Sequence, residues 1–156
     1  MASLEEAFVS TASKFKIPSL NDHQKLAIEK ILLQKKDVFV NLPTGFGKSL
    51  IYQALPLVCD HIDNLAGHIV VIVSPLVSLM EDQVNYLQSI GVSAVKISSQ
   101  ADIDRPSIEN GKYSLVFGSP EAWLKNDRWR SMLGNDVYRS RLCAVAIDEA
   151  HVIRQW

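Results

Sequence analysis

Short apolar runs typical of buried strands alternate along the chain with longer segments of helical periodicity. The predicted strands cover residues 37–42, 68–73, 94–97, 113–118 and 143–147. The predicted helices cover residues 3–13, 21–35, 48–60, 74–91 and 120–132, and a polar loop with a short helical turn fills 98–112. Continuous apolar strands separated by helices are typical of a parallel sheet covered on both faces. We therefore predict an α/β fold.

Polar residues at the predicted helix ends support these boundaries. Ser3 and Glu6 have the S-x-x-E spacing of a capping box, and Asn21 is the expected N-cap of the second helix. We expect Ser74 to cap the helix that follows the second strand and Gly91 to end it. The expected inner face of the second helix consists of Leu26, Ala27, Ile31 and Leu33.

Composition narrows the class of protein. The chain has 156 residues, of which 47% are hydrophobic and 21% charged, which is typical of one globular domain and excludes disordered, coiled-coil and collagen-like chains. A net charge of -1 excludes a basic protein that coats nucleic acid but allows a local phosphate-binding groove. Cys59 and Cys143 favour neither a disulfide framework nor a zinc site and are expected to be buried. Without a long apolar run or a signal peptide, we expect an intracellular chain with no membrane partner.

The strongest chemical signal is the segment 43–49, P-T-G-F-G-K-S, between a predicted strand and a predicted helix. Gly45 and Gly47 allow backbone N–H groups to turn toward a phosphate, and the positive end of the helix points to the same place. Lys48 can reach the β and γ phosphates, and the Ser49 hydroxyl can bind Mg²⁺. The strict P-loop pattern has Gly where this chain has Leu42. The alternative is a glycine-rich strand-to-helix turn without a ligand.

A second signal follows the last predicted strand, where the chain reads Asp148-Glu149-Ala150-His151. A carboxylate at Asp148 can hold Mg²⁺, as a Walker B aspartate does, and Glu149 can orient or deprotonate an attacking water. Phosphoryl transfer requires charge neutralisation and a positioned nucleophile, and the two motifs supply both. The alternative is a solvated Asp-Glu turn.

Together, the motifs make the chain resemble the RecQ family of superfamily 2 DNA helicases. The family's phosphate loop carries a hydrophobic residue at the position of Leu42, and its acidic box reads D-E-A-H. Residues 73–84 (V-S-P-L-V-S-L-M-E-D-Q-V) resemble RecQ motif Ia, and 117–121 (F-G-S-P-E) resemble motif Ib. Gln155-Trp156 is similar to the start of the aromatic-rich loop that follows the box. The resemblance covers roughly residues 15–156 and implies a RecA-like lobe with helices on both faces of a parallel sheet.

The resemblance implies roles for individual residues. Catalysis would involve Lys48, Asp148, Glu149 and His151, with His151 linking the nucleotide to DNA. The ATP-binding residues would be Gln24, Thr44, Gly45, Phe46, Gly47, Lys48 and Ser49. Gln24 would contact adenine, although it could equally be only the third residue of a capping box with Asn21. Mg²⁺ would be held by Ser49 and Asp148. Contacts to DNA would come from Ser74, Ser119, Gln155 and Trp156, and both serines can also be plain helix caps.

The same resemblance implies the domain organisation. We expect residues 1–20 to form an N-terminal helix and loop, and 21–156 an ATP-binding lobe that is incomplete after the Walker B strand. A second RecA-like lobe with an arginine finger would belong to the same polypeptide, so we expect the chain alone to be poorly soluble and nearly inactive. The implied activity is ATP-dependent 3′→5′ unwinding of single-stranded and forked DNA in the nucleus. The alternatives are an RNA-directed superfamily 2 ATPase and a truncated product that binds a nucleotide or partner without turnover.

Overall fold

The computed structural model describes residues 3–33, 47–97 and 105–148 and divides into two compact units, Met1–His68 and Ile69–Trp156. The described residues of the first unit form three helices, α1 (Leu4–Lys14), α2 (Asp22–Leu32) and α3 (Lys48–Asp63). Both α1 and α2 pack against α3. The predicted strand 37–42 and the loop residues 43–46 lie outside the described residues.

Side-chain caps begin α1 and α2, as the sequence predicts. The Ser3 hydroxyl accepts a hydrogen bond from the Glu6 N–H at 3.1 Å, and Asn21 caps α2. The predicted inner face of α2 is wrong at two positions, because Leu26 and Leu33 are exposed. The buried residues of α2 are Gln24, Ala27 and Ile28. The polar Gln24 therefore lies on the buried face of α2, where the hydrophobic pattern predicted leucine.

The second unit is a parallel α/β layer structure. Its elements are β1 (Ile69–Val73), α4 (Val77–Ser89), β2 (Ala94–Lys96), α5 (Arg105–Glu109), β3 (Leu115–Gly118), α6 (Pro120–Lys125), α7 (Asp127–Leu133), α8 (Asp136–Arg141) and β4 (Leu142–Ile147). The four described strands are ordered β2-β3-β1-β4, and every pairing is parallel. This confirms the predicted parallel sheet.

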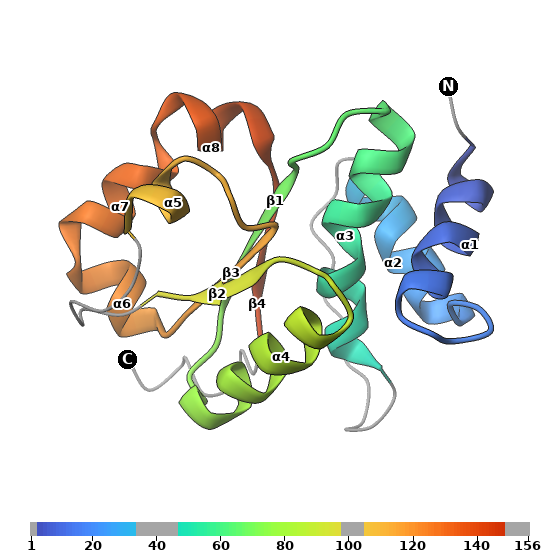
Figure 1. The fold of residues 1–156 in the computed structure, drawn as a ribbon, viewed down its shortest axis with the longest axis horizontal. Coiled ribbons are helices and arrows are strands. Elements are labelled where there is room, and N and C mark those ends of the chain that lie inside the picture. The colour runs from blue at the N-terminus through green and yellow to red at the C-terminus, as the bar shows by residue number, and fades with distance from the viewer. Residues whose placement is uncertain (1–2, 34–46, 98–104, 149–156) are drawn as a thin grey trace. The chain divides into compact units, whose positions relative to one another are not determined.

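Helices cover both faces of this sheet (Figure 1). On one face, Ile69, Val71 and Val116 belong to a core with buried residues of α5–α8. The residues that these helices contribute are Ile108, Trp123, Trp129, Met132 and Tyr138. On the other face, α4 packs over β2 and β3 through its buried residues Met80, Val84 and Leu87. Trp123 and Trp129 are therefore both buried in the core of this face.

β4 departs from the regular pattern of the sheet in two ways. Its pairing with β1 shifts register, because Ile69 pairs with Leu142 while Val70 pairs with Ala144, which leaves Cys143 as an extra residue. Beyond this bulge, Val145 and Ile147 are 54% and 56% exposed. Among the described residues, β4 pairs with no strand other than β1. This end of the described sheet therefore presents apolar side chains to solvent.

The predicted helix 120–132 is wrong in one respect, because the structure divides it into α6 and α7. Asn126 has extended backbone angles (φ -106, ψ 109), and its side-chain oxygen accepts from the N–H groups of Arg128 at 3.0 Å and Trp129 at 3.4 Å. Asparagine side chains compete with helical backbone bonds in this way and favour N-cap positions. The sequence analysis also missed α8, which Asn135 caps by accepting from the Tyr138 N–H at 2.9 Å.

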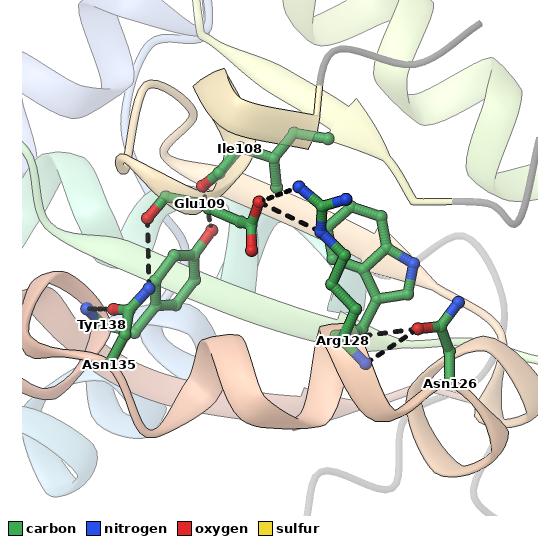
Figure 2. A network of polar contacts seen from close by, with 7 residues as sticks. Ile108, Glu109, Asn126, Arg128, Asn135 and Tyr138 are labelled. Carbon is green, nitrogen blue, oxygen red and sulfur yellow. Dashed lines mark hydrogen bonds and ion pairs between the residues drawn. The ribbon is translucent and has the colours of Figure 1, made fainter. Parts of the chain in front are cut away.

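A polar network holds α5 against α7 and α8 (Figure 2). Arg128 Nε donates to Glu109 Oε1 at 3.2 Å, and its Nη2 contacts the same oxygen. Asn135 donates to the Glu109 carbonyl at 3.3 Å, and the Tyr138 hydroxyl donates to the Ile108 carbonyl at 2.8 Å. The buried Tyr138 therefore provides a hydrogen-bond donor for a carbonyl in the last turn of α5.

Candidate nucleotide and nucleic-acid site

The nucleotide-binding candidates of the first unit meet at the start of α3. Gly47 is the N-cap residue and has the left-handed conformation (φ 76, ψ 28), which glycine adopts without steric cost. Lys48 and Ser49 form the first turn of α3, and both are half-buried. The first N–H groups of a helix have no partner within it and carry its positive dipole end. Lysine, hydroxyl and helix N-terminus are therefore together, which is the donor set that a phosphate requires.

Gln24 lies beside this turn and is nearly fully buried. Its Oε1 accepts from the Asn21 N–H at 2.9 Å, and its own N–H donates to Asn21 Oδ1 at 2.9 Å, so the capping box is present. Its Nε2 also donates to the Gly47 carbonyl at 3.1 Å. The adenine contact predicted for Gln24 stays a prediction. The sequence analysis missed the contact with Gly47, because residues 23 positions apart share no local signal.

The candidates of the second unit form a row along the carboxyl edge of the sheet. Ser119, Ser74 and Asp148 directly follow β3, β1 and β4, which are neighbours in the sheet. The Ser74 N–H donates to the Gly118 carbonyl at 3.0 Å, and the Asp148 N–H donates to the Val73 carbonyl at 2.9 Å. Ligands of open parallel sheets bind at this edge, so the backbone bonds hold the three residues where a ligand is expected.

The two serines differ in their helix-capping roles. Ser119 caps α6 as predicted, because its hydroxyl accepts from the Ala122 N–H at 3.1 Å and Pro120 occupies the first turn. The prediction that Ser74 caps α4 is wrong. That helix begins at Val77, its N-cap is Leu76, and the Ser74 hydroxyl instead accepts from the Leu76 N–H at 3.4 Å. Because the Ser74 N–H is hydrogen-bonded to Gly118 of the neighbouring strand, Ser74 continues the sheet and α4 starts three residues later.

Several predicted site residues lie outside the described part of the chain. They are Thr44, Gly45, Phe46, Glu149, His151, Gln155 and Trp156. Their roles stay predictions.

Other expectations concern residues away from the site. Two exposed arginines form ion pairs, Arg128 with Glu109 and Arg130 with Asp127. Cys59 is buried, whereas Cys143 is only half-buried, and both are free thiols. In the described ranges no three His, Cys, Asp or Glu side chains gather as a metal site, and no helix there has the length and apolarity to cross a bilayer.

The fold and these motifs define a class of protein. The chain belongs to the DEAD/DEAH box helicase family, whose model matches residues 21–156. Among solved structures it is similar to the DUF1998 helicase MrfA in its crystal structure with DNA and AMPPNP, with a TM-score of 0.67 and 23% identity over 97% of this chain and 22% of that one. This similarity supports the fold, and the predicted RecA-like α/β class is confirmed.

The curated relatives narrow the class further. ATP-dependent DNA helicase Q1 of Rattus norvegicus is 35% identical over 131 residues, which are 80% of this chain and 20% of the relative. ATP-dependent helicase SGS1 of Saccharomyces cerevisiae is 35% identical over 147 residues, 91% of this chain and 10% of the relative. ATP-dependent DNA helicase RecQ of Haemophilus influenzae is 36% identical over 129 residues, 80% of this chain and 19% of the relative. The predicted resemblance to RecQ helicases is confirmed, and the chain spans a fifth or less of these three relatives.

Proposed function

We propose that this chain binds MgATP and forms part of the first motor lobe of an ATP-dependent DNA helicase of RecQ type. The observation that carries the proposal is the start of α3, where left-handed Gly47 precedes Lys48 and Ser49 in a chain that matches the helicase family. The names of the relatives support both the use of ATP and DNA as the substrate.

Each described residue has a role that its chemistry allows. The Lys48 ammonium pairs with the β and γ phosphates, while the first N–H groups of α3 donate to phosphate oxygens. The Ser49 hydroxyl and the Asp148 carboxylate each offer an oxygen atom as a metal ligand, which is the kind of ligand that Mg²⁺ prefers. Bound Mg²⁺ would neutralise charge that develops on the transferred phosphate. Glu149 is the proposed base that orients the attacking water.

DNA is the proposed second ligand. Ser119 is half-buried at the carboxyl edge of the sheet, whereas Ser74 is 1% exposed and would need its surroundings to open before it touched a phosphate. Gln155 and Trp156 are further proposed contacts, and His151 would relay the state of the nucleotide. Unwinding of forked DNA with 3′→5′ polarity, a second lobe and a nuclear location are proposed from the RecQ resemblance. Comparing substrates with a 3′ or a 5′ single-stranded tail, in the full-length polypeptide, tests the polarity.

Two alternatives are separated by the response to nucleic acid. An RNA-directed ATPase would hydrolyse ATP faster with single-stranded RNA than with DNA. A nucleotide-binding product without turnover would respond to neither. The proposed helicase responds to DNA when its second lobe is present, and the 156-residue chain alone is expected to remain near background.

Nucleotide binding is tested with Lys48→Ala in the chain as it stands. Loss of a charge-assisted contact to phosphate should weaken MgATP binding about ten- to a hundredfold, measured by titration calorimetry. Lys96→Ala is the matched control, because Lys96 Nζ lies 2.7 Å from Glu81 Oε1 on the surface of the other unit. Equal affinities of Lys48→Ala and the wild type would contradict the proposal.

A further inference from the structure

One side-chain amide joins the start of α2 to the residue that precedes α3. The Gln24 amide accepts from the Asn21 N–H through Oε1 at 2.9 Å and donates to the Gly47 carbonyl through Nε2 at 3.1 Å. Gln24 is only 4% exposed. A buried amide with both ends bonded is held in one orientation, because either bond is lost if the side chain rotates.

The two bonds also fix which end of the amide is which. A flipped amide would place its NH₂ group against the Asn21 N–H and its oxygen against the Gly47 carbonyl. A donor would then face a donor at Asn21, and an acceptor would face an acceptor at Gly47. Each bond uses one of the two lone pairs of Oε1 or one of the two hydrogens of Nε2. The contact with Gly47 is therefore compatible with a further partner.

Gly47 is constrained at the same contact. A Cβ atom at this position would lie 2.5 Å from Gln24 Nε2 and would displace the amide, and the positive φ favours glycine as well. Its carbonyl also accepts from the Leu50 N–H at 3.2 Å, within the first turn of α3. Gln24 thus holds the carbonyl from which α3 starts. The direction of the peptide plane between Gly47 and Lys48 follows from that carbonyl, since the peptide unit is planar.

We propose that Gln24 is a positioning residue for the phosphate-binding turn, and that it acts on phosphate affinity independently of any contact with adenine. The inference rests on the proposed nucleotide binding at Lys48 and Ser49. By fixing the Gly47 carbonyl, Gln24 orients the Lys48 N–H, which belongs to the same peptide plane. The affinity of a ligand with phosphates but no base should therefore also depend on Gln24.

The experiment compares MgATP with magnesium tripolyphosphate in Gln24→Met, which keeps length and neutrality but removes both the Nε2 donor to Gly47 and the Oε1 acceptor from Asn21. The affinity for magnesium tripolyphosphate is expected to fall roughly three- to tenfold, which corresponds to the loss of the one hydrogen bond to Gly47, and the affinity for MgATP is expected to fall at least as much. Gln24→Asn retains an amide that is too short to reach Gly47, and it replaces the methionine variant if that variant does not fold.

Two controls separate positioning from stability. Asn21→Ala removes the cap of α2 but leaves the donor of Gln24 in place, so it should lower the unfolding temperature without changing either affinity. Gln88→Met removes a similar bond elsewhere, from Gln88 Nε2 to the Ala94 carbonyl at 3.0 Å, and should also leave both affinities unchanged.

The outcomes are distinct. A loss confined to MgATP would show that Gln24 acts on adenine alone, and an equal loss in Asn21→Ala would assign the effect to the stability of α2. Either result overturns the positioning role, as do unchanged affinities in Gln24→Met. If the wild-type chain binds neither ligand, the proposed nucleotide binding fails first, and the positioning role fails with it.

Discussion

The indole nitrogen of Trp123 lies 2.5 Å from the position that a Cβ atom on Gly118 would occupy. Trp123 Nε1 also donates to the Ile72 carbonyl at 3.3 Å, so the ring crosses the end of β3 to reach β1. Ile97 closes the same space, with its Cγ1 at 2.8 Å from that Cβ position. The absence of a side chain at Gly118 therefore allows the aromatic ring to pack directly on the sheet.

Gly118→Ala should destabilise the protein by about 1–3 kcal/mol, because an extra methyl group forces neighbouring core atoms to move. Urea-induced unfolding measures this change. Gly134→Ala is the matched control, since its Cβ would meet only the Ser131 carbonyl oxygen at 3.6 Å, an ordinary contact. Equal stabilities of the two variants would show that the Trp123 ring shifts without cost.

Tyr138 should make the free energy of unfolding depend on pH in the alkaline range. Burial, followed by the nearby Glu109 carboxylate, raises the pKa of Tyr138 above its ordinary value. The folded protein therefore keeps the phenol proton at a pH where the unfolded chain releases it. Stability from this group is fully present below about pH 10, the ordinary pKa of tyrosine, and is lost as the pH rises toward the folded pKa.

Tyr138→Phe tests this pH dependence. The variant loses the hydrogen bond to the Ile108 carbonyl and should be less stable than the wild type by about 0.5–1.5 kcal/mol near pH 8. Between about pH 8 and pH 10.5 its stability should fall less than that of the wild type. Tyr86→Phe, at an exposed position, should follow the wild type. Parallel pH curves for Tyr138→Phe and the wild type would contradict the prediction.

The apolar side chains at the end of the described sheet should promote self-association. Val145 and Ile147 pair with Val71 and Val73 and lie on the same face of the sheet as their partners, yet both are more than half exposed. Exposed apolar strands at a sheet edge favour pairing with other chains.

Replacing Val145 and Ile147 together by threonine should reduce association, measured by light scattering at increasing concentration. Threonine keeps the β-branched shape that strands favour, so the free energy of unfolding should change by less than about 1 kcal/mol. Val9→Thr changes an equally apolar exposed residue on α1 and should leave association unchanged. If both variants associate like the wild type, the β4 surface is not the cause.

Local signals predicted the helix ends most reliably. Ser3, Asn21 and Ser119 cap helices through bonds to N–H groups three positions away, so the residues involved are visible in a short window. The glycine turn before α3 was predicted for the same reason, because Gly47, Lys48 and Ser49 are adjacent in the sequence, and its phosphate ligand stays a prediction. Both kinds of signal depend on spacing and not on the rest of the fold.

The errors came from tertiary contacts. Trp123 and Trp129 belong to one core cluster, but six residues in a continuous helix would turn them about 120° apart. The break at Asn126 allows both to face the sheet, and the helical period alone cannot predict it. Likewise, Ser74 continues the pairing with Gly118 and cannot begin a helix. Gln24 of α2 is buried with both ends of its amide bonded while Leu26 is exposed, which a hydrophobic pattern cannot predict.

The extra residue at Cys143 divides β4 into two parts that pair with β1 in different registers. Leu142 is positioned by its pairing with Ile69 and by packing against the core that includes Tyr138 of α8. Asp148 is positioned by the hydrogen bond from its N–H to the Val73 carbonyl. In a regular strand, a one-residue slip at the start would turn every later side chain to the opposite face. Here the bulge absorbs one residue, so the register of Leu142 and the face on which the Asp148 side chain lies are set independently of each other.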